Sequence, residues 1–196
     1  MRALASLAAL LAGLAAGCAP EAPKFLASDV TGTTYGRDFQ LTDHNGKPRT
    51  LADFRGKVVV LFFGYTQCPD VCPTTLAELA ETMKRLGPDA DRVQVLFATV
   101  DPDRDSAELL SKYVPAFDPR FLGLFGDAAA TERTAREFKI IYQKQPGNTA
   151  GAYTVDHSAG TFVFDPQGRI RLYVSYGRGP EVFAHDIALL LRTAES

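Results

Sequence analysis

A continuous apolar run, Val58 to Phe63, restricts the fold of this chain more than any other feature of its sequence. A run of this kind is typical of a strand whose two faces are both buried in a sheet. Gly64 ends the run, and apolar residues then recur at helical spacing from Leu76 to Leu86, where Gly87-Pro88 stops them. The sequence therefore predicts a buried strand, a short loop and a helix in succession.

Two cysteines, Cys68 and Cys72, stand in that loop, and each precedes a proline. Because Pro73 suits the first helical position and keeps its predecessor out of the helical region, we expect Cys72 at or near the N-cap and Cys68 in an exposed loop before it. The positive end of a helix lowers a thiol pKa and favours the thiolate, which is both a metal ligand and a nucleophile. Two inert buried cysteines, or a structural disulfide, are the alternatives that this pattern leaves open.

Strands and helices alternate along the rest of the chain. The Asn45-Gly46 turn predicts an early hairpin, from about residue 39 to residue 51. Further strands are predicted at 93–100 and 121–125 and a hairpin at 161–176, with helices at about 105–114, 128–139 and 180–191. Residues 140–145 are expected to be extended and 146–151 to form a polar loop.

This order predicts an α/β protein with a central mixed β-sheet flanked by helices. With the cysteine pair directly after the first long strand, it is a thioredoxin-like fold with an N-terminal β-hairpin extension, and we expect the domain to cover residues 34–196.

Polar side chains outside the cysteine loop are candidates for the same site. Asp101 and Asp103 follow the second buried strand at the sheet edge where open α/β sheets bind ligands, although such residues often serve only as loop and cap groups. We expect His157 at the mouth of the 161–176 hairpin, where Asp156 and Ser158 could orient its ring. A solvated surface histidine is the alternative.

Three segments together resemble the Sco (SenC-like) family of copper chaperones: 64–73, GYTQCPDVCP; 100–105, VDPDRD; and 155–158, VDHS. The resemblance extends over nearly all of residues 34–191. It implies a thioredoxin fold, attachment to the outer side of a membrane, and a role in assembling the dinuclear copper centre of cytochrome c oxidase.

The resemblance also assigns residues. It implies that Cys68 and Cys72 are thiolate ligands and His157 is the imidazole ligand of one copper per chain, as Cu(I) or Cu(II). It implies that Asp101 assists copper uptake or partner docking, and we expect Asp156, beside His157, in a supporting place. Two soft thiolates and an imidazole suit copper, whereas a structural zinc site requires four ligands. We also expect the two cysteines to form a reversible redox disulfide.

Delivery of copper without enzymatic turnover is therefore the leading interpretation. The expected partners are the copper-accepting subunit of cytochrome c oxidase and, beside it, another periplasmic copper chaperone or a thioredoxin-like reductant. A thiol-disulfide oxidoreductase that keeps the oxidase cysteines reduced, or a redox or copper sensor, would use the same two cysteines. His157 separates these readings, because a dithiol reductase does not need it. A peroxiredoxin-like peroxidase is less favoured, since the loop holds a paired thiol.

The first residues predict export. Arg2 precedes an apolar segment, Ala3–Ala16, that is too short to span a bilayer comfortably. Small residues before Cys18 predict a lipoprotein-type signal peptide, residues 1–17, cleaved before a lipidated Cys18, with a tether at 18–33. Many family members instead carry a transmembrane anchor. We expect an extracytoplasmic protein, lipid-anchored at the periplasmic face of the inner membrane. The net charge of -2 and the lack of a basic run argue against a nucleic-acid partner.

Overall fold

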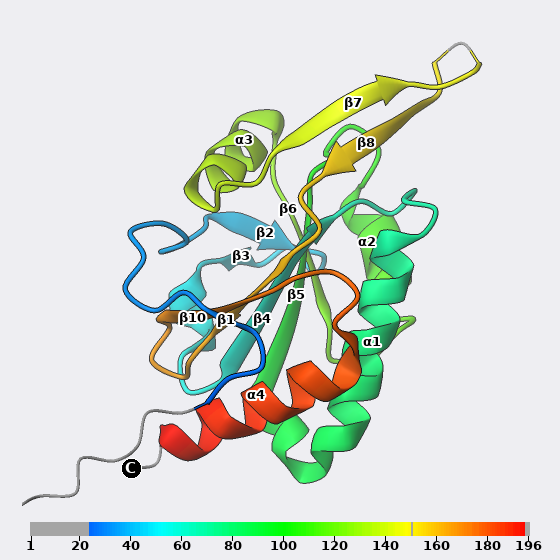
Figure 1. The fold of residues 1–196 in the computed structure, drawn as a ribbon. Coiled ribbons are helices and arrows are strands. Elements are labelled where there is room, and N and C mark those ends of the chain that lie inside the picture. The colour runs from blue at the N-terminus through cyan, green and yellow to red at the C-terminus, as the bar shows by residue number, and fades with distance from the viewer. Residues whose placement is uncertain (1–23, 150, 195–196) are drawn as a thin grey trace, which may run out of the picture.

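The computed structural model describes residues 24–149 and 151–194 of this chain (Figure 1). The strands are β1 (Ser28–Asp29), β2 (Leu41–Asp43), β3 (Pro48–Arg49), β4 (Val58–Gly64), β5 (Val93–Thr99), β6 (Leu122–Phe125), β7 (Tyr142–Pro146), β8 (Tyr153–His157), β9 (Thr161–Phe164) and β10 (Ile170–Val174). The helices are α1 (Val71–Leu86), α2 (Ala107–Tyr113), α3 (Ala128–Glu137) and α4 (Gly179–Thr193), with 3-10 helices η1 (Leu51–Phe54) and η2 (Gly87–Arg92).

The predicted central mixed sheet is confirmed. Its strands lie in the order β1-β10-β9-β4-β5-β6-β2-β3. β4 pairs in parallel with β5 from Val58↔Val93 to Gly64↔Thr99, and it pairs antiparallel with β9 on its other side. All seven residues of β4 are buried, as expected for an apolar run at the centre of a sheet.

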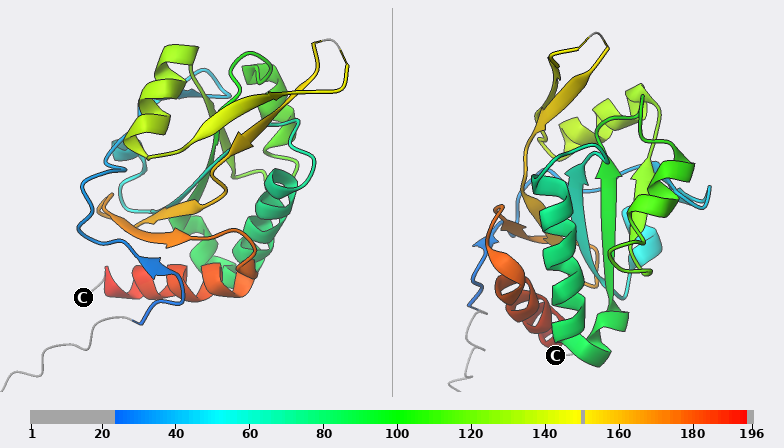
Figure 2. Two further views of the ribbon diagram at one scale, coloured as in Figure 1. Left: turned by 45° about the horizontal axis from the view of Figure 1, so that its top comes forward. Right: turned by 90° about the vertical axis from the view of Figure 1, so that its right-hand side faces the viewer.

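Helices cover both faces of this sheet. Because neighbouring side chains of a strand point to opposite faces, Phe62 and Phe63 enter different layers. Helices α1 and α2 cover one face (Figure 2), where Phe62 packs with Phe97. The ring centroid of Tyr113 of α2 lies 5.9 Å from that of Phe97 on this face. Phe63 packs on the other face against Phe138, which directly follows α3. α4 lies against α1.

Helix α1 begins two residues before Pro73, the predicted first helical position. Asp70 is the N-cap and Val71 the first helical residue, so Cys72 lies near the cap, as expected, within the first turn. Pro73 is accommodated there, because the first N–H groups of a helix have no intrahelical acceptor in any case. The Cys72 side chain faces the core, where it is 0% exposed, so the alternative of a buried cysteine holds for this residue.

The hairpin that carries His157 also differs. The predicted hairpin at 161–176 exists as β9 and β10, but His157 ends β8, which pairs with β7 from Tyr142↔His157 to Pro146↔Tyr153. This second hairpin projects from the body of the molecule (Figure 1), and residues 146–151, predicted as a loop, include its tip. Most β7 side chains are exposed and polar, so the sequence lacks the alternation that identifies a half-buried strand.

The N-terminal part of the described chain is attached to the domain. The backbone N–H groups of Leu26 and Ala27 donate to the Asp186 carboxylate of α4 at 2.9 and 2.8 Å, and β1 pairs with β10. Residues 24–33, assigned from sequence to the tether, therefore contact the folded domain. The predicted signal peptide and Cys18 lie outside the described residues.

Gly64 provides a test of this architecture. A Cβ at this position would lie 2.7 Å from Cys72 Sγ and 2.8 Å from Phe97 Cε2, so Gly64→Ala must displace the thiol or the ring. We expect it to lower the free energy of unfolding by about 1–3 kcal/mol and to change the reactivity of Cys72. Thermal unfolding and thiol labelling of the variant measure the two effects.

Gly87→Ala is the matched control. Gly87 has a positive φ of 56° and nothing near its missing Cβ, so this variant strains the backbone without approaching Cys72. Equal thiol reactivity in the two variants would contradict the close approach at Gly64.

Candidate metal centre

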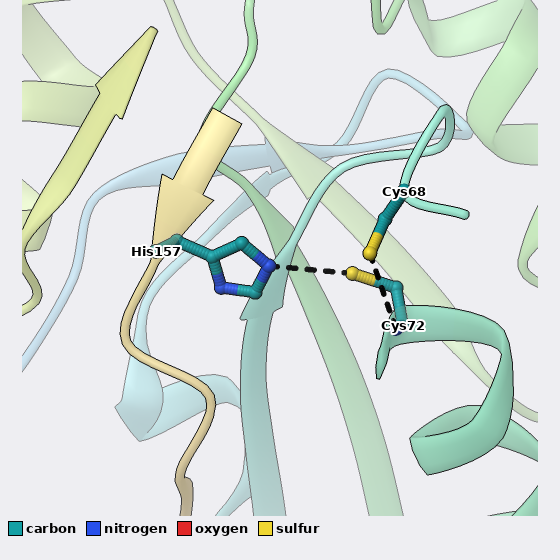
Figure 3. Close-up of side chains that lie close together, drawn as sticks. All are labelled: Cys68, Cys72 and His157. Atoms are coloured by element: carbon teal, nitrogen blue, oxygen red, sulfur yellow. Dashed lines mark hydrogen bonds between the residues drawn. The ribbon is translucent and has the colours of Figure 1, made fainter. Parts of the chain in front are cut away.

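Three potential metal ligands meet at the carboxyl end of β4. Cys68 comes from the loop after β4, Cys72 from the first turn of α1 and His157 from the end of β8 (Figure 3). One ligand atom from each residue can be chosen so that all three lie within 4.8 Å of one another. Among the described residues no other cysteine, histidine, aspartate or glutamate belongs to this group. The three residues that the sequence singled out as ligands therefore lie together.

Cys72 is the inner thiol of the group. Its Sγ lies 3.5 Å from His157 Nε2, and its backbone N–H donates to Cys68 Sγ at 3.4 Å. Burial raises the pKa of the Cys72 thiol well above its usual value, and the hydrogen bond and negative charge of Cys68 raise this pKa further. The helix end was expected to lower this pKa, and that expectation is wrong for Cys72. A metal ion must therefore displace a proton from this thiol.

His157 presents the nitrogen that a metal needs. Its Nδ1 lies 3.0 Å from the carbonyl oxygen of Ser158, and a carbonyl can only accept, so Nδ1 carries the proton. Nε2 then points a lone pair toward Cys72. Burial lowers the pKa of His157, which favours the neutral ring that binds metals, while the Ser158 carbonyl and the charge of Asp156 act in the opposite direction.

The ring of His157 is oriented by main chain and by aromatic packing. The Asp156 carboxylate accepts from Gln145 at 2.9 Å, so the expected orientation by this side chain is replaced by the Ser158 carbonyl. The imidazole packs edge-on against Tyr65 and Phe62, with ring centroids 5.9 and 6.3 Å away. Tyr65 is almost fully buried, so the imidazole lies against a fixed wall.

Asp101 lies beneath the surface beside this centre. Its side chain is 0% exposed, and its two oxygens accept from the Tyr153 hydroxyl at 2.7 Å and from Arg104 Nε at 2.5 Å. A carboxylate in this position can support the hairpin, but it offers no surface to a docking partner.

Sequence reasoning did not place Arg104, Tyr153 or Asp105 at the metal centre, and it assigned Asp105 to the start of a helix whose N-cap is Ser106 in the structure. Asp105 accepts from the Thr66 backbone at 3.1 Å and from the Thr66 hydroxyl at 2.5 Å, and so fixes the start of the cysteine loop. Burial raises the pKa of Asp105, whereas the hydrogen bonds from the Thr66 and Thr99 hydroxyls act to lower it. Arg104 and Asp105 fall inside the 100–105 segment, but a motif shows residue types and not which groups they contact.

A cleft of about 490 Å³ gives access to the centre. Cys68 and His157 line it, whereas Cys72 lies behind them in the core. Asp70 and Asp156 also line the cleft, and no Lys or Arg does so. The arrangement can therefore hold a soft metal ion between three ligands and leave one side open to an incoming group.

The fold and the centre together define a thioredoxin-like protein with a metal site of two thiols and one imidazole. A family model of SCO1/SenC proteins matches residues 28–192. The chain belongs to the SCO1/SenC family. In the part of the chain that the structure describes, no helix has both the length and the apolar character needed to cross a lipid bilayer.

Individual relatives agree with this assignment. "Protein SCO2 homolog, mitochondrial" of Mus musculus is 39% identical over 152 residues, which are 76% of this chain and 60% of the relative, so the chain spans about three fifths of that protein. The structure of Bradyrhizobium japonicum ScoI with copper bound is 41% identical with a TM-score of 0.71, covering 77% of this chain and 96% of ScoI. Apo Sco1 from Thermus thermophilus is 41% identical with a TM-score of 0.77, covering 86% and 98%.

The two thiols should react at different rates. Cys72 is fully buried with a raised pKa, and Cys68 opens on the cleft. In the reduced, metal-free protein near pH 8 we expect iodoacetamide to modify Cys68 at least about tenfold faster, because the thiolate is the nucleophile. Mass spectrometry of the proteolytic peptides measures each cysteine separately. In guanidinium chloride the difference should disappear, and equal rates in the native protein would contradict the inner position of Cys72.

Proposed function

We propose that this chain is a copper-binding metallochaperone that delivers copper to the dinuclear centre of cytochrome c oxidase during its assembly. The observation that carries the proposal is the meeting of Cys68, Cys72 and the Nε2 atom of His157 in one group of ligand atoms. Membership of the SCO1/SenC family supports it, as does copper in the related ScoI structure. The function of the whole protein is proposed, because the chain spans only part of its mitochondrial relatives.

The ligand chemistry favours copper. Thiolate sulfur selects Cu(I), and imidazole serves copper in both oxidation states. When copper binds, the Cys72 proton leaves and the thiolate takes its place beside His157 Nε2, which is already unprotonated in the metal-free protein. One copper per chain follows from one group of ligands among the described residues. The open side at Cys68 lets an acceptor thiolate approach the ion and replace the ligands of this chain one at a time.

A thiol-disulfide oxidoreductase is the second candidate, favoured by the closeness of the two free thiols, Cys68 in the loop and Cys72 in the first turn of α1. In that reaction Cys68 and Cys72 form a disulfide while a disulfide of the oxidase subunit gains two electrons and two protons. The buried, protonated Cys72 would act only after Cys68 attacks. This role gives no reason for a neutral imidazole beside Cys72, which is why we rank it second.

The proposed partners and location follow the same reading. The copper acceptor is the copper-binding subunit of cytochrome c oxidase, and the copper donor is another periplasmic copper chaperone. A thioredoxin-like reductant would keep the two thiols reduced. We propose that the protein is held at the periplasmic face of the inner membrane through a lipidated Cys18.

Copper binding can be tested on the ligand variants. In a Cys18→Ser background, which leaves two thiols, X-ray absorption should show one copper with two sulfur ligands. His157→Ala should weaken copper binding by about 100-fold or more, since even changes beyond the ligands cost 10–100-fold. His185→Ala is the control, because His185 lies on α4 and contacts Asp186. Another sulfur count, or unchanged affinity in His157→Ala, would rule out this site.

The pH dependence follows from the raised pKa of Cys72. Below that pKa the metal-free thiol keeps its proton, and copper must displace it. Apparent copper affinity should therefore rise with pH, by about tenfold per unit for each proton displaced.

Transfer of copper from the loaded protein to a copper-free oxidase subunit distinguishes the metallochaperone from the thiol-disulfide oxidoreductase. If the protein reduces a disulfide of that subunit but transfers no copper to it, the oxidoreductase becomes the favoured function.

The anchor is tested by intact mass. Membrane-extracted protein should begin at Cys18 and carry the added mass of acyl chains, whereas Cys18→Ser should abolish this mass. A mature chain that begins elsewhere, or an unmodified Cys18, would refute the anchor without affecting the copper site.

A further inference from the structure

The strand that carries His157 is not held by the main sheet. β8 pairs with β7, and these two strands form a sheet of their own. A two-stranded hairpin is only marginally stable by itself in water. His157 ends this hairpin, while Cys68 and Cys72 stand on the loop and helix that follow β4. Contacts other than sheet pairing must therefore set the distance between the imidazole and the two sulfurs.

The outer edge of β8 shows which contacts do so. The carbonyl of Tyr153 accepts from Arg104 Nη1 at 2.9 Å, and the backbone of Val155 is hydrogen-bonded to the hydroxyl of Tyr65. Tyr65 directly follows β4, and Arg104 lies in the loop after β5. Side chains from the two loops beside the metal site thus occupy the edge that another strand would occupy in a larger sheet.

Arg104 reaches further than Tyr65. Its Nη1 also donates to Gln67 Oε1 at 3.1 Å, immediately before Cys68, and its Nε donates to the buried carboxylate of Asp101. Its guanidinium carbon lies 3.6 Å from the centre of the Tyr153 ring. The planar, multi-donor guanidinium makes all these contacts at once, which a lysine cannot do. One side chain therefore connects the cysteine loop, the loop after β5 and the strand of His157.

A second link between these elements is weaker. Lys144 of β7 pairs with Asp103 at 2.5 Å, but the two side chains are 47% and 65% exposed. Exposed ion pairs contribute little, because water screens them and both side chains lose freedom. The Arg104 side chain is 19% exposed and its Asp101 partner 0%. The contacts that can fix the hairpin are therefore the buried ones, those of Arg104 together with the hydrogen bond from the Tyr153 hydroxyl to Asp101.

We propose that Arg104 is a positioning residue of the copper site. It holds β8 against the cysteine loop, and so keeps His157 Nε2 where it can share one copper ion with Cys68 and Cys72. The proposal rests on the copper-binding function proposed above and adds to it a residue that touches neither copper nor a ligand atom. Arg104 acts through the hairpin, and its effect on copper must therefore pass through His157.

The test needs a variant that folds. Arg104→Met alone would leave the Asp101 carboxylate buried without its cation, so we pair it with Asp101→Asn. An asparagine oxygen can still accept from Tyr153, and the paired variant then lacks mainly the guanidinium contacts to Gln67 and to the β8 carbonyl. The control is Asp43→Asn with Arg49→Met. There the arginine is 18% exposed, the aspartate 0%, and Arg49 Nε lies 2.8 Å from Asp43 Oδ2 at a distant sheet edge.

Cu(I) affinity is measured on the full chain carrying Cys18→Ser, by competition with a chromogenic Cu(I) chelator under reducing conditions. We expect the paired variant to bind Cu(I) about tenfold more weakly, at the lower end of the range for residues that orient metal ligands. The Cu(I) affinity of the control pair should stay within about twofold of that of the parent, even if both pairs lower the melting temperature equally. Parent-like affinity in the Arg104 pair, or an equal loss in both pairs, would overturn the proposal.

Adding His157→Ala shows whether the effect passes through the imidazole. In that background the Arg104 pair should cause no further loss of affinity, because there is no ring left to position. Losses that multiply would mean that Arg104 acts elsewhere, and the proposal would fail. Arg104→Lys, with Asp101 retained, keeps the positive charge but loses the guanidinium contacts, so it should bind Cu(I) more weakly than the parent. Parent-like Cu(I) affinity in this variant would overturn the role of Arg104 in positioning β8.

The same experiment distinguishes failure of the copper site from failure of this proposal. If His157→Ala binds Cu(I) as well as the parent, the imidazole is not a ligand and both proposals fall. If His157→Ala loses affinity while the Arg104 pair does not, the copper site stands and the positioning role of Arg104 is refuted.

Discussion

The parallel pairing of β4 with β5 places the two loops beside the metal centre, the cysteine loop and the loop that holds Asp101 and Arg104. Two adjacent strands that run in the same direction end at the same edge of the sheet, so the cysteine loop and the 101–105 loop leave the sheet side by side. Close packing on both faces of the two strands fixes this register, because a shift by one residue would exchange the side chains that fill each packed layer. The absence of a side chain at Gly64 then lets α1 approach closely enough to place Cys72 against the end of β4.

How much of this could be predicted differs from one element to the next. The β4 run and the Cys68–Cys72 loop were predictable because long buried strands and helix starts leave strong local signals. The hairpin of His157 was misplaced, because β7 is solvent-exposed and leaves no such signal. The protonation of Cys72 could not be read from sequence either, since it depends on burial that only the folded chain determines. The choice of His157 as a ligand came from the resemblance, and the structure adds the Ser158 carbonyl that directs its nitrogen.

Burial favours the neutral forms of Cys72 and His157 in the metal-free centre. A low-polarity environment disfavours charge, so the inner thiol keeps its proton and the imidazole stays uncharged. The two groups lie 3.5 Å apart, close enough for the thiol proton to occupy the space between sulfur and Nε2. A cation that enters replaces this proton and supplies the positive charge that makes a buried thiolate stable. Binding and deprotonation are thus one event at Cys72, while Cys68 remains the ligand that faces the cleft.

The β7–β8 hairpin separates the imidazole from its own connecting turn. Five consecutive residue pairs, without a bulge, run from Tyr142↔His157 at one end to Pro146↔Tyr153 at the other. The ligand is fixed at the first pair and the turn follows the last, so residues can be added to the turn without shifting the register at His157. The cost of closing a longer turn grows only with the logarithm of its length. The segment between Pro146 and Tyr153 is therefore a place where this chain can accept a fluorophore-binding peptide or an affinity tag, at the far end of the hairpin from the metal centre.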